Sequence, residues 1–294
     1  MFLNLPYLAA FQCNPEYATA EAGTGRAVPI TIAKAEAALL RSALRHEIVR
    51  EYRSIDHDAI VAAYEPLLDL VFSYVDPAVH CLPIFTTNYD LAIETLCETV
   101  GSKYELEDGL ELDPISKTAF WNRSQFDLYR LGYGRRHLVQ FKLHGSVDWI
   151  RSAKSGRIVR APAMYDGLDS DEYQNAIIYP AGNKLANRDP YFSAYEYFAR
   201  CCEQTEVLIV IGYSFRDYDA LNRLMGARGR NQRLKVVLLS PDAYGIISDV
   251  NDEDLRYSIK PVSACFGKLS QETEYLQRIE GSLRCLRAPV ADAG

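Results

Sequence analysis

The chain has 294 residues, of which 48% are hydrophobic and 24% are charged. This balance is ordinary for a globular protein, and it excludes a disordered or fibrous chain. The formal net charge of -7 argues against non-specific binding to the phosphate backbone of nucleic acids. No apolar run approaches the roughly eighteen residues that a membrane-spanning helix needs.

Seven cysteines are scattered along the chain without a CxxC pair, and the five histidines are scattered as well. We therefore expect neither a disulfide framework nor a bound metal. The apolar N-terminus lacks the basic start of a secretory signal. Together these features predict a cytoplasmic protein with no membrane segment and no direct nucleic-acid binding.

Residues 1–80 are predicted to form an N-terminal, mainly helical region. Apolar residues recur at four-residue spacing from Leu40 to Tyr52. A second stretch, from Ile60 to Tyr74, also places its apolar residues on one helical face. The first 28 residues have only weak periodicity, and no convincing strand is expected there.

Residues 81–294 have a different pattern, in which short apolar runs lead into polar loops and then usually into helical periodicity. Several of these runs are continuously apolar, which is typical of parallel strands buried on both faces. The pattern predicts a doubly wound α/β domain with insertions near 101–136 and 151–176. The predicted strands are Leu82–Thr87, Leu138–Leu143, Ala176–Tyr179, Val207–Gly212 and Leu234–Leu239; the predicted helices are Leu91–Val100, Tyr191–Glu203 and Tyr218–Ala227.

Small and polar residues follow four of the predicted strands, where the ligand of a doubly wound sheet binds. Taken singly, each of these endings has a simpler structural explanation. Asp90 precedes a helical pattern and suits an N-cap, and a lone histidine such as His144 is more often structural than catalytic. Four endings in register favour one shared crevice. They are Thr86-Thr87-Asn88-Tyr89-Asp90, His144-Gly145-Ser146, Gly212-Tyr213-Ser214-Phe215-Arg216-Asp217 and Ser240-Pro241-Asp242.

The order and spacing of four segments resemble the sirtuin-like (SIR2) domain, in its bacterial defence-associated, NAD-hydrolysing branch. The resemblance covers about residues 80 to 245 and implies a Rossmann-like fold that binds NAD. The segments are FTTNYDLAIE (85–94), KLHGSVDW (142–149), IIYPAGNK (177–184) and VLIVIGYSFRDYDALN (207–222).

The resemblance also implies roles for individual residues. Asn88 and His144 match the catalytic Asn and His of the family. The remaining matches are expected to bind NAD. They are Thr87, Asp90, Gly212, Ser214, Ser240 and Asp242. Ser240 and Asp242 match the family more loosely, at the position of the adenosine ribose.

One Asn and one His also make chemical sense for cleaving the bond between nicotinamide and ribose. Nicotinamide leaves as a neutral molecule, so no general acid has to protonate it. An Asn amide can hold a ribose hydroxyl or a water, and a His can take a proton near neutral pH. The paired carboxylates of the usual glycosidase mechanism are not needed.

The sequence departs from the family in two places. The two CxxC pairs that hold a structural zinc in sirtuin deacylases are absent, which argues against protein deacylation. The strand and GAGxS loop that cradle the pyrophosphate are also missing. Gly23 and Gly25 are either a diverged form of this loop or part of an ordinary surface loop. If the loop is absent, the chain is inactive alone or depends on a partner to complete the site.

We therefore expect an NAD glycohydrolase that acts in prokaryotic antiviral defence by depleting NAD, with no metal. The alternatives are a catalytically weak NAD or ADP-ribose binding subunit of a defence complex and, less favoured, an NAD-dependent deacylase. Activity is expected to be gated by a partner protein encoded nearby or by homo-oligomer formation. The docking surface would be the N-terminal helices or the basic stretch 122–162. The alternative for this basic stretch is a solvent-exposed face with no partner.

Overall fold

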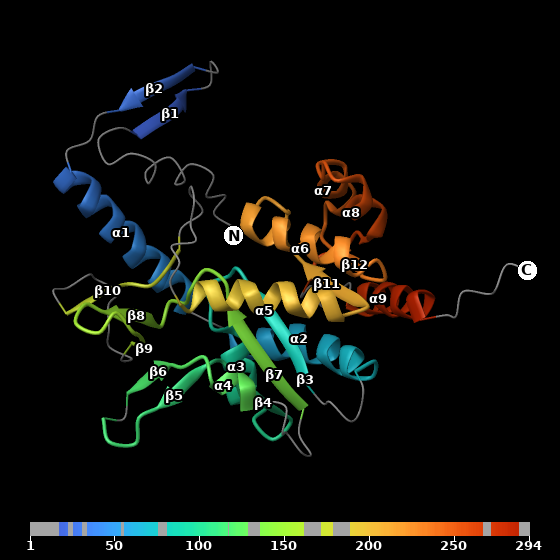
Figure 1. Ribbon diagram of the computed structural model, residues 1–294, viewed down its shortest axis with the longest axis horizontal. Helices are drawn as coiled ribbons and strands as arrows, with labels where there is room; N and C mark the ends of the chain where they lie inside the picture. The colour runs from blue at the N-terminus through green and yellow to red at the C-terminus, as the bar shows by residue number, and fades with distance from the viewer. Residues whose placement is uncertain are drawn as a thin grey trace, which may run out of the picture.

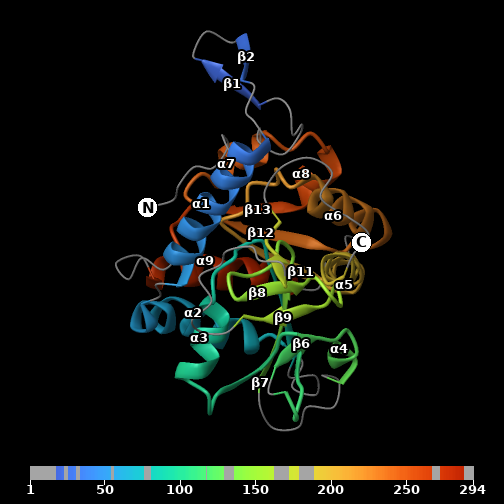
Figure 2. The same cartoon turned by 90° about the vertical axis from the view of Figure 1, so that its left-hand side faces the viewer.

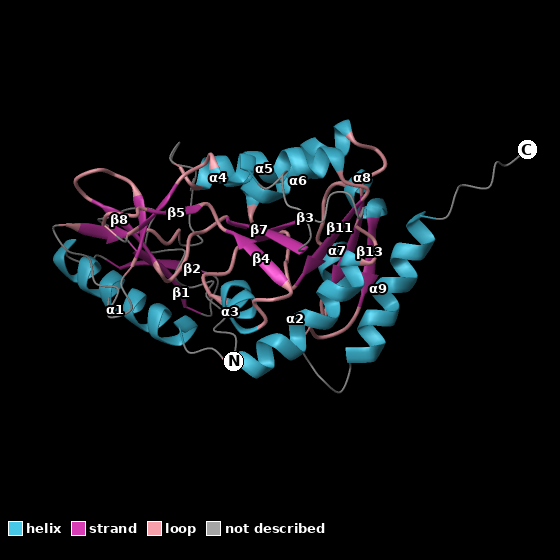
Figure 3. Ribbon diagram, turned by 90° about the horizontal axis from the view of Figure 1, so that it is seen from below, coloured by secondary structure: helices cyan, strands magenta, loops and turns pink. Residues whose placement is uncertain are grey.

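The computed structural model describes residues 18–22, 26–30, 34–53, 56–75, 81–116, 118–128, 136–161, 172–178, 189–266 and 272–287. Within these ranges the chain forms a layer of parallel strands with helices on both faces (Figure 3). The predicted α/β class with parallel sheets is confirmed. The parallel strands divide into two three-stranded sheets, where the pattern predicted one.

The first parallel sheet has the order β3-β7-β4. In the register of β3 and β7, Thr86 lies opposite Lys142, so both strands end at the same level. The polar residues that follow the two strands are therefore neighbours, as predicted. The strands are β3 (Cys81–Thr86), β4 (Tyr104–Glu107) and β7 (Arg136–Lys142).

The second parallel sheet has the order β11-β12-β13. Ile211 lies opposite Leu239, so the loops that begin at Gly212 and Ser240 leave the sheet side by side. The central strand is completely buried from Val236 to Leu239, which explains its continuous run of apolar residues. The strands are β11 (Val207–Ile211), β12 (Lys235–Leu239) and β13 (Ile259–Val262).

Helices on each face link the two sheets. On one face, α5 contacts β3 and β7 and packs along α6, and this core also takes in Leu208 and Val210 of β11. On the other face, α2 packs against α3 and α9. The helices of this domain are α2 (His57–Phe72), α3 (Ala92–Thr99), α5 (Tyr191–Gln204), α6 (Tyr218–Arg230), α7 (Ala243–Ser248), α8 (Glu253–Ser258) and α9 (Glu272–Arg287).

A small antiparallel sheet occupies the regions where insertions were predicted. Its order is β10-β8-β9-β6-β5, and Figure 2 shows β8, β9 and β6 following one another in that order. The short helix α4 (Gln125–Leu128) follows β6. The strands are β5 (Leu110–Leu112), β6 (Ala119–Trp121), β8 (Trp149–Ser152), β9 (Ile158–Arg160) and β10 (Tyr173–Asn175).

The N-terminal part contains two strands that the mainly helical prediction did not include. Strands β1 (Ala18–Ala22) and β2 (Arg26–Ile30) form an antiparallel hairpin, which stands apart from the parallel sheets in Figure 1. A strand therefore does precede Gly23, although none was expected. Gly23 and Gly25 themselves lie outside the described residues. The helix α1 (Lys34–Arg53) follows and agrees with the predicted periodicity.

One predicted strand is wrong. Residues 176–178 have no regular structure, and Tyr179 lies outside the described residues. The segment is apolar because Ala176 and Ile177 are buried beside the antiparallel sheet and α1. A short apolar run reports burial, and burial alone does not distinguish a strand from a packed loop.

Candidate active site

Asn88 and His144 lie at the ends of the paired strands β3 and β7. The backbone N–H of Leu143 donates to the Thr86 carbonyl oxygen at 2.9 Å, and that of Val147 donates to the Tyr89 carbonyl at 3.0 Å. These bonds hold the two polar loops together beyond the ends of the strands. Asn88 is exposed, whereas His144 is only 6% exposed.

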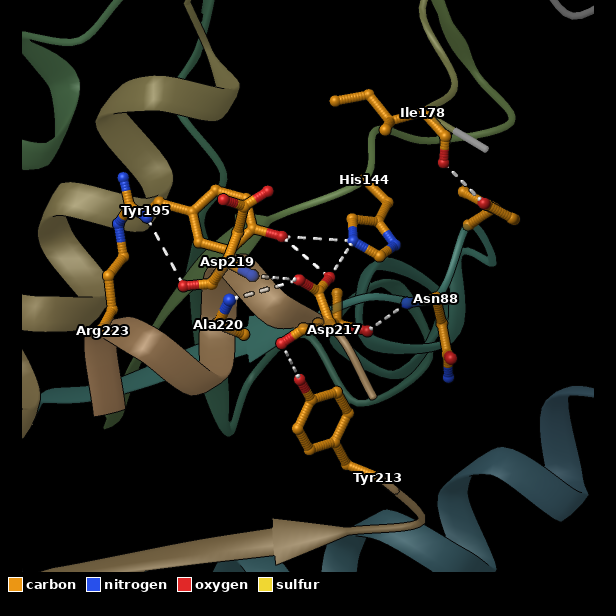
Figure 4. A network of polar contacts seen from close by, with 11 residues as sticks. Asn88, His144, Ile178, Tyr195, Tyr213, Asp217, Asp219, Ala220 and Arg223 are labelled. Atoms are coloured by element: carbon orange, nitrogen blue, oxygen red, sulfur yellow. Dashed lines mark hydrogen bonds and ion pairs between the residues drawn. The ribbon is translucent and has the colours of Figure 1, made fainter. Parts of the chain in front are cut away.

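The Asn88 loop is ordered locally by its neighbours. The backbone N–H of Asn88 donates to Thr86 Oγ1 at 3.0 Å. This bond does not involve the side-chain amide of Asn88. In Figure 4 the Asn88 side chain points away from the imidazole ring of His144. Asp90 Oδ1 accepts from the Ala92 N–H at 3.0 Å. Asp90 therefore accepts a hydrogen bond from the first residue of α3, one position before the N-cap residue Leu91. Thr87, which precedes Asn88, is half-buried.

His144 is bound to a carboxylate that reaches it from the other parallel sheet (Figure 4). Its Nε2 lies 2.6 Å from Asp217 Oδ2 and 3.2 Å from the Tyr195 hydroxyl. The Tyr195 hydroxyl also donates to Asp217 Oδ2 at 3.0 Å. Because an ionised carboxylate only accepts hydrogen bonds, Nε2 carries a proton, and Nδ1 is the nitrogen that has the lone pair when the imidazole is neutral. The neutral ring therefore presents Nδ1 as its basic nitrogen.

Both oxygens of Asp217 are used. Oδ1 accepts the N–H groups of Asp219 at 3.0 Å and Ala220 at 3.2 Å, which makes Asp217 the N-cap of α6. Burial alone would raise the pKa of Asp217, but the hydrogen bond and charge of His144 outweigh it. The pKa of this carboxyl is held well below its usual range, so Asp217 is ionised at neutral pH.

The loop between β11 and α6 contains two residues with left-handed backbone conformations. Gly212 has φ +64°, and a Cβ placed there meets no atom within 4 Å. Phe215 has φ 57° and is buried, which is an uncommon conformation for a bulky residue. The loop therefore runs close to the end of the sheet, with open space in front of Gly212 and Phe215 anchoring it from behind.

The remaining predicted binding residues lie in the loops that follow β11 and β12 of the second sheet. The Gly212 N–H donates to the Leu239 carbonyl at 2.9 Å, which places this loop beside the one that starts at Ser240. Ser240 is buried, and its Oγ accepts from the Asp242 N–H at 3.3 Å. Ser214 and Asp242 are exposed. The structure thus groups Asn88 and His144 on one sheet and these four residues on the other, joined by the contact between His144 and Asp217.

Two residues of this network escaped the sequence argument. Asp217 lay within a strand ending that was considered important, yet no role was expected for it. Tyr195 lies within the predicted helix Tyr191–Glu203, and no role was expected for its hydroxyl. Its side chain is in the core, where it is only 1% exposed. The available signal for Asp217 was an acidic residue at the start of a predicted helix, within a strand ending already expected to line the crevice, whereas nothing in the sequence marked the Tyr195 hydroxyl.

The basic stretch 122–162 is not a single solvated face. Lys142 lies in the interior, where its side chain is 2% exposed and ion-paired with Glu94 at 3.0 Å. Other members are directed to different parts of the molecule. Arg136 contacts Asp69, Arg157 lies over the ring of Phe120, and Arg160 pairs with both Asp108 and Asp148.

No helix within the described ranges is both long and apolar enough to span a bilayer. In the same ranges no group of three metal-ligating side chains comes together. A sequence comparison with curated proteins finds no match.

Comparison with solved structures finds distant likenesses. A Sir2 homologue mutant in complex with ADP-ribose is 13% identical, with a TM-score of 0.46, covering 85% of this chain and 78% of that one. A Sir2 homologue in complex with NAD is 12% identical, with a TM-score of 0.43, covering 84% and 73%. The family assignment rests on sequence instead. The model of the SIR2-like domain family matches residues 83–262, which is more than half of the chain. The chain therefore belongs to the SIR2-like domain family.

Proposed function

We propose that this protein is an NAD glycohydrolase, which converts NAD and water into nicotinamide and ADP-ribose. The observation that carries this proposal is the buried pair of His144 and Asp217, 2.6 Å apart. His144 follows β7, and the exposed Asn88 follows β3, the strand paired with it. Family membership supports the choice of NAD as the substrate, as does the open space before Gly212 in the neighbouring loop.

The reaction requires little acid catalysis. The bond between ribose C1′ and the nicotinamide nitrogen breaks, and its electron pair neutralises the pyridinium ring. A water oxygen then bonds to C1′. We assign the proton of that water, or of a ribose hydroxyl, to His144 Nδ1, which passes it on to solvent. Asp217 holds the Nε2 proton and stabilises the imidazolium that forms.

Asn88 would hold the water or the ribose hydroxyl, since its amide both donates and accepts hydrogen bonds. Gly212 and Ser214 would lie along the nucleotide half of NAD, and Ser240 and Asp242 near the adenosine ribose. Thr87 and Asp90 would shape the loop that carries Asn88. In this arrangement the first sheet performs the chemistry and the second binds the nucleotide.

One observation favours a second candidate, a subunit that binds NAD or ADP-ribose with little turnover. Within the described residues, β3 and β11 each pair with another strand along one edge only. Both strands are also less buried than β12. A parallel sheet normally has its central strands covered on both edges. If the site needs a further strand along the open edge of β3 or β11, the chain alone binds NAD weakly and turns it over slowly.

The purified chain, incubated with NAD and analysed by chromatography, separates these functions. We expect equal amounts of nicotinamide and ADP-ribose without any added peptide. Binding without product would support the second candidate. Product that forms only after addition of an acyl-lysine peptide would support the third, NAD-dependent deacylation, against which the absence of CxxC pairs argues.

We also propose a biological role, a cytoplasmic effector of prokaryotic antiviral defence that depletes NAD. The motifs quoted above support this role through their resemblance to the defence-associated branch. The test is the NAD content of bacteria carrying the gene during phage infection. We expect a fall that is absent with the His144→Ala variant. NAD levels that stay equal in the two strains would contradict the role.

A further inference from the structure

Lys142 is a charged residue in the protein interior that the proposed mechanism does not use. It is the last residue of β7, and its side chain is only 2% exposed. Its Nζ pairs with Glu94 Oε1 at 3.0 Å and donates to the backbone carbonyl of Asp90. Glu94, in the first turn of α3, is itself 11% exposed and also accepts from Gln140 Nε2 at 3.3 Å.

Such a pair is costly to bury. Removing two charges from water consumes much of their mutual attraction, and apolar residues of similar volume often stabilise a fold equally well. Burial raises the pKa of Glu94, and the charge of Lys142 only partly offsets this effect. Leu138, Val139 and Phe141 fill other positions of the same strand. Packing alone therefore does not explain a lysine at this position.

The position of Lys142 suggests what it contributes. It precedes His144 by two residues, and the carbonyl that it binds belongs to Asp90, two residues after Asn88. One ammonium group thus ties the end of the strand that carries His144 to the loop that carries Asn88. An apolar side chain cannot donate this hydrogen bond. Glu94 compensates the charge without touching the loop.

We propose that Lys142 is a positioning residue, which sets the Asn88 loop against His144 through the Asp90 carbonyl. The inference rests on the proposed NAD hydrolysis for its kinetic readout. Displacing a catalytic group by about 1 Å costs on the order of a hundredfold in rate. Loss of this bond should therefore lower kcat, while contacts of NAD with the second sheet keep KM nearly constant.

Two variants isolate the bond. Lys142→Met alone would leave the Glu94 charge buried and unpaired, which threatens folding. The double variant Glu94→Gln with Lys142→Met removes both charges and leaves Gln140 a partner. Glu94→Gln alone keeps the donor, because even a neutral amine can donate to the Asp90 carbonyl. The difference between the single and the double variant then reports the lost bond.

Lys103→Met is the matched control. Lys103 pairs with Glu65 at 2.6 Å and Asp69 at 2.8 Å, just before β4 begins. Because β4 runs parallel to β7, this ion pair lies at the opposite end of the same sheet from the active site. The control removes a lysine ion pair without touching the Asn88 loop.

Steady-state kinetics and amide hydrogen exchange supply two independent readouts. For the double variant, we expect kcat to fall at least about tenfold with KM changed less than about threefold, and faster exchange in residues 87–91. Glu94→Gln and Lys103→Met should change neither readout. If the wild-type chain does not hydrolyse NAD, the exchange measurement alone decides the inference. A folded double variant with unaltered kcat, or with unaltered exchange, would overturn it.

Discussion

At the scale of single residues, the contact between His144 and Asp217 would couple the proposed catalysis to stability. Asp217 caps α6 with one oxygen and orients the imidazole with the other. Asparagine is the informative replacement, because it caps helices as well as aspartate does. Its amide would donate towards His144 Nε2 and favour the wrong tautomer.

We expect Asp217→Asn to lower the rate of NAD hydrolysis by about a hundredfold or more, the usual size of a general-base contribution. The measurement is the initial rate at saturating NAD, with circular dichroism to confirm the fold. Tyr195→Phe removes only one hydroxyl from the same carboxylate, and its effect should be several times smaller. Equal effects of the two variants would contradict the assigned roles.

The stability of Asp217→Asn should also depend on pH. The pKa of Asp217 is lower in the folded protein than in the unfolded chain, where it is about 3.9. Its stabilising contribution, about 2 kcal/mol for a hydrogen bond to a charged group, is thus complete above that value and is lost as pH falls towards the folded pKa. Urea unfolding at pH 5 and pH 3.5 should show a smaller advantage of the wild type over the variant at the lower pH.

The position of a single residue in the fold was predictable where the residue and the strand that it follows lie in one short segment of sequence. Asn88 and His144 could be placed at neighbouring strand ends because each follows an apolar run directly. Asp217 and Tyr195 act through contacts across 73 and 51 residues with His144. Such contacts depend on how two sheets and a helix pack, and no spacing within one segment reports them.

At the scale of elements, the loop from Gly212 to Asp217 has left-handed backbone conformations at Gly212 and Phe215 and is held in place by hydrogen bonds. The left-handed conformation of Gly212 costs an L-residue about 1–2 kcal/mol, although space for a Cβ is open. A methyl group at this position would therefore project into the open space where we propose that the nucleotide binds, rather than into the protein.

We expect Gly212→Ala to raise the dissociation constant of NAD about tenfold or more, beyond its modest cost in stability. Gly156→Ala is the matched control, since Gly156 also has positive φ, +69°, with no atom within 4 Å of a Cβ. It lies between β8 and β9, away from the strand ends of both parallel sheets. Calorimetric titration and thermal unfolding of both variants separate the two effects. Equal stability losses with unchanged NAD affinity would exclude Gly212 from the binding site.

Helices and strands were predictable where apolar residues repeat at one constant spacing along the segment. Helix α6 begins at Tyr218 as expected, because Asp217 is a strong N-cap and the apolar face follows. Residues 176–178 were misassigned because a packed loop and a strand can share the same apolar composition. The hairpin of β1 and β2 was missed because β1 consists of Ala, Thr and Glu. These residues alternate between apolar and polar, but Ala and Glu are depleted in strands, so the run is a weak strand signal.

At the scale of the whole molecule, the arrangement of the sheets bears on regulation. The backbone hydrogen bonds around Asn88 and His144 belong to the first parallel sheet. Those of Gly212 and Ser240 belong to the second. Within the described part of the chain, the facing helices and the bond between His144 and Asp217 connect these halves. Any partner that shifts one sheet relative to the other would alter the site.

We therefore expect the isolated chain to be weakly active and to gain activity in a larger complex, through a partner encoded nearby or through self-assembly. The measurement compares NAD hydrolysis by the purified chain with that of complexes co-purified with products of neighbouring genes, at equal concentration. Size-exclusion chromatography of the same samples assigns each rate to an oligomeric state. A monomer that works at full rate, unchanged by any neighbour, would contradict this gating.

The most direct test of the central claim is nicotinamide release from NAD by the wild-type protein, measured beside His144→Ala and Asn88→Ala. Each variant should be shown to be folded by thermal unfolding, and all three proteins should be assayed in the most active assembly obtained. The proposed mechanism predicts stoichiometric nicotinamide and ADP-ribose from the wild type and a loss of about a hundredfold or more in each variant. A folded variant that releases nicotinamide at the wild-type rate would contradict it.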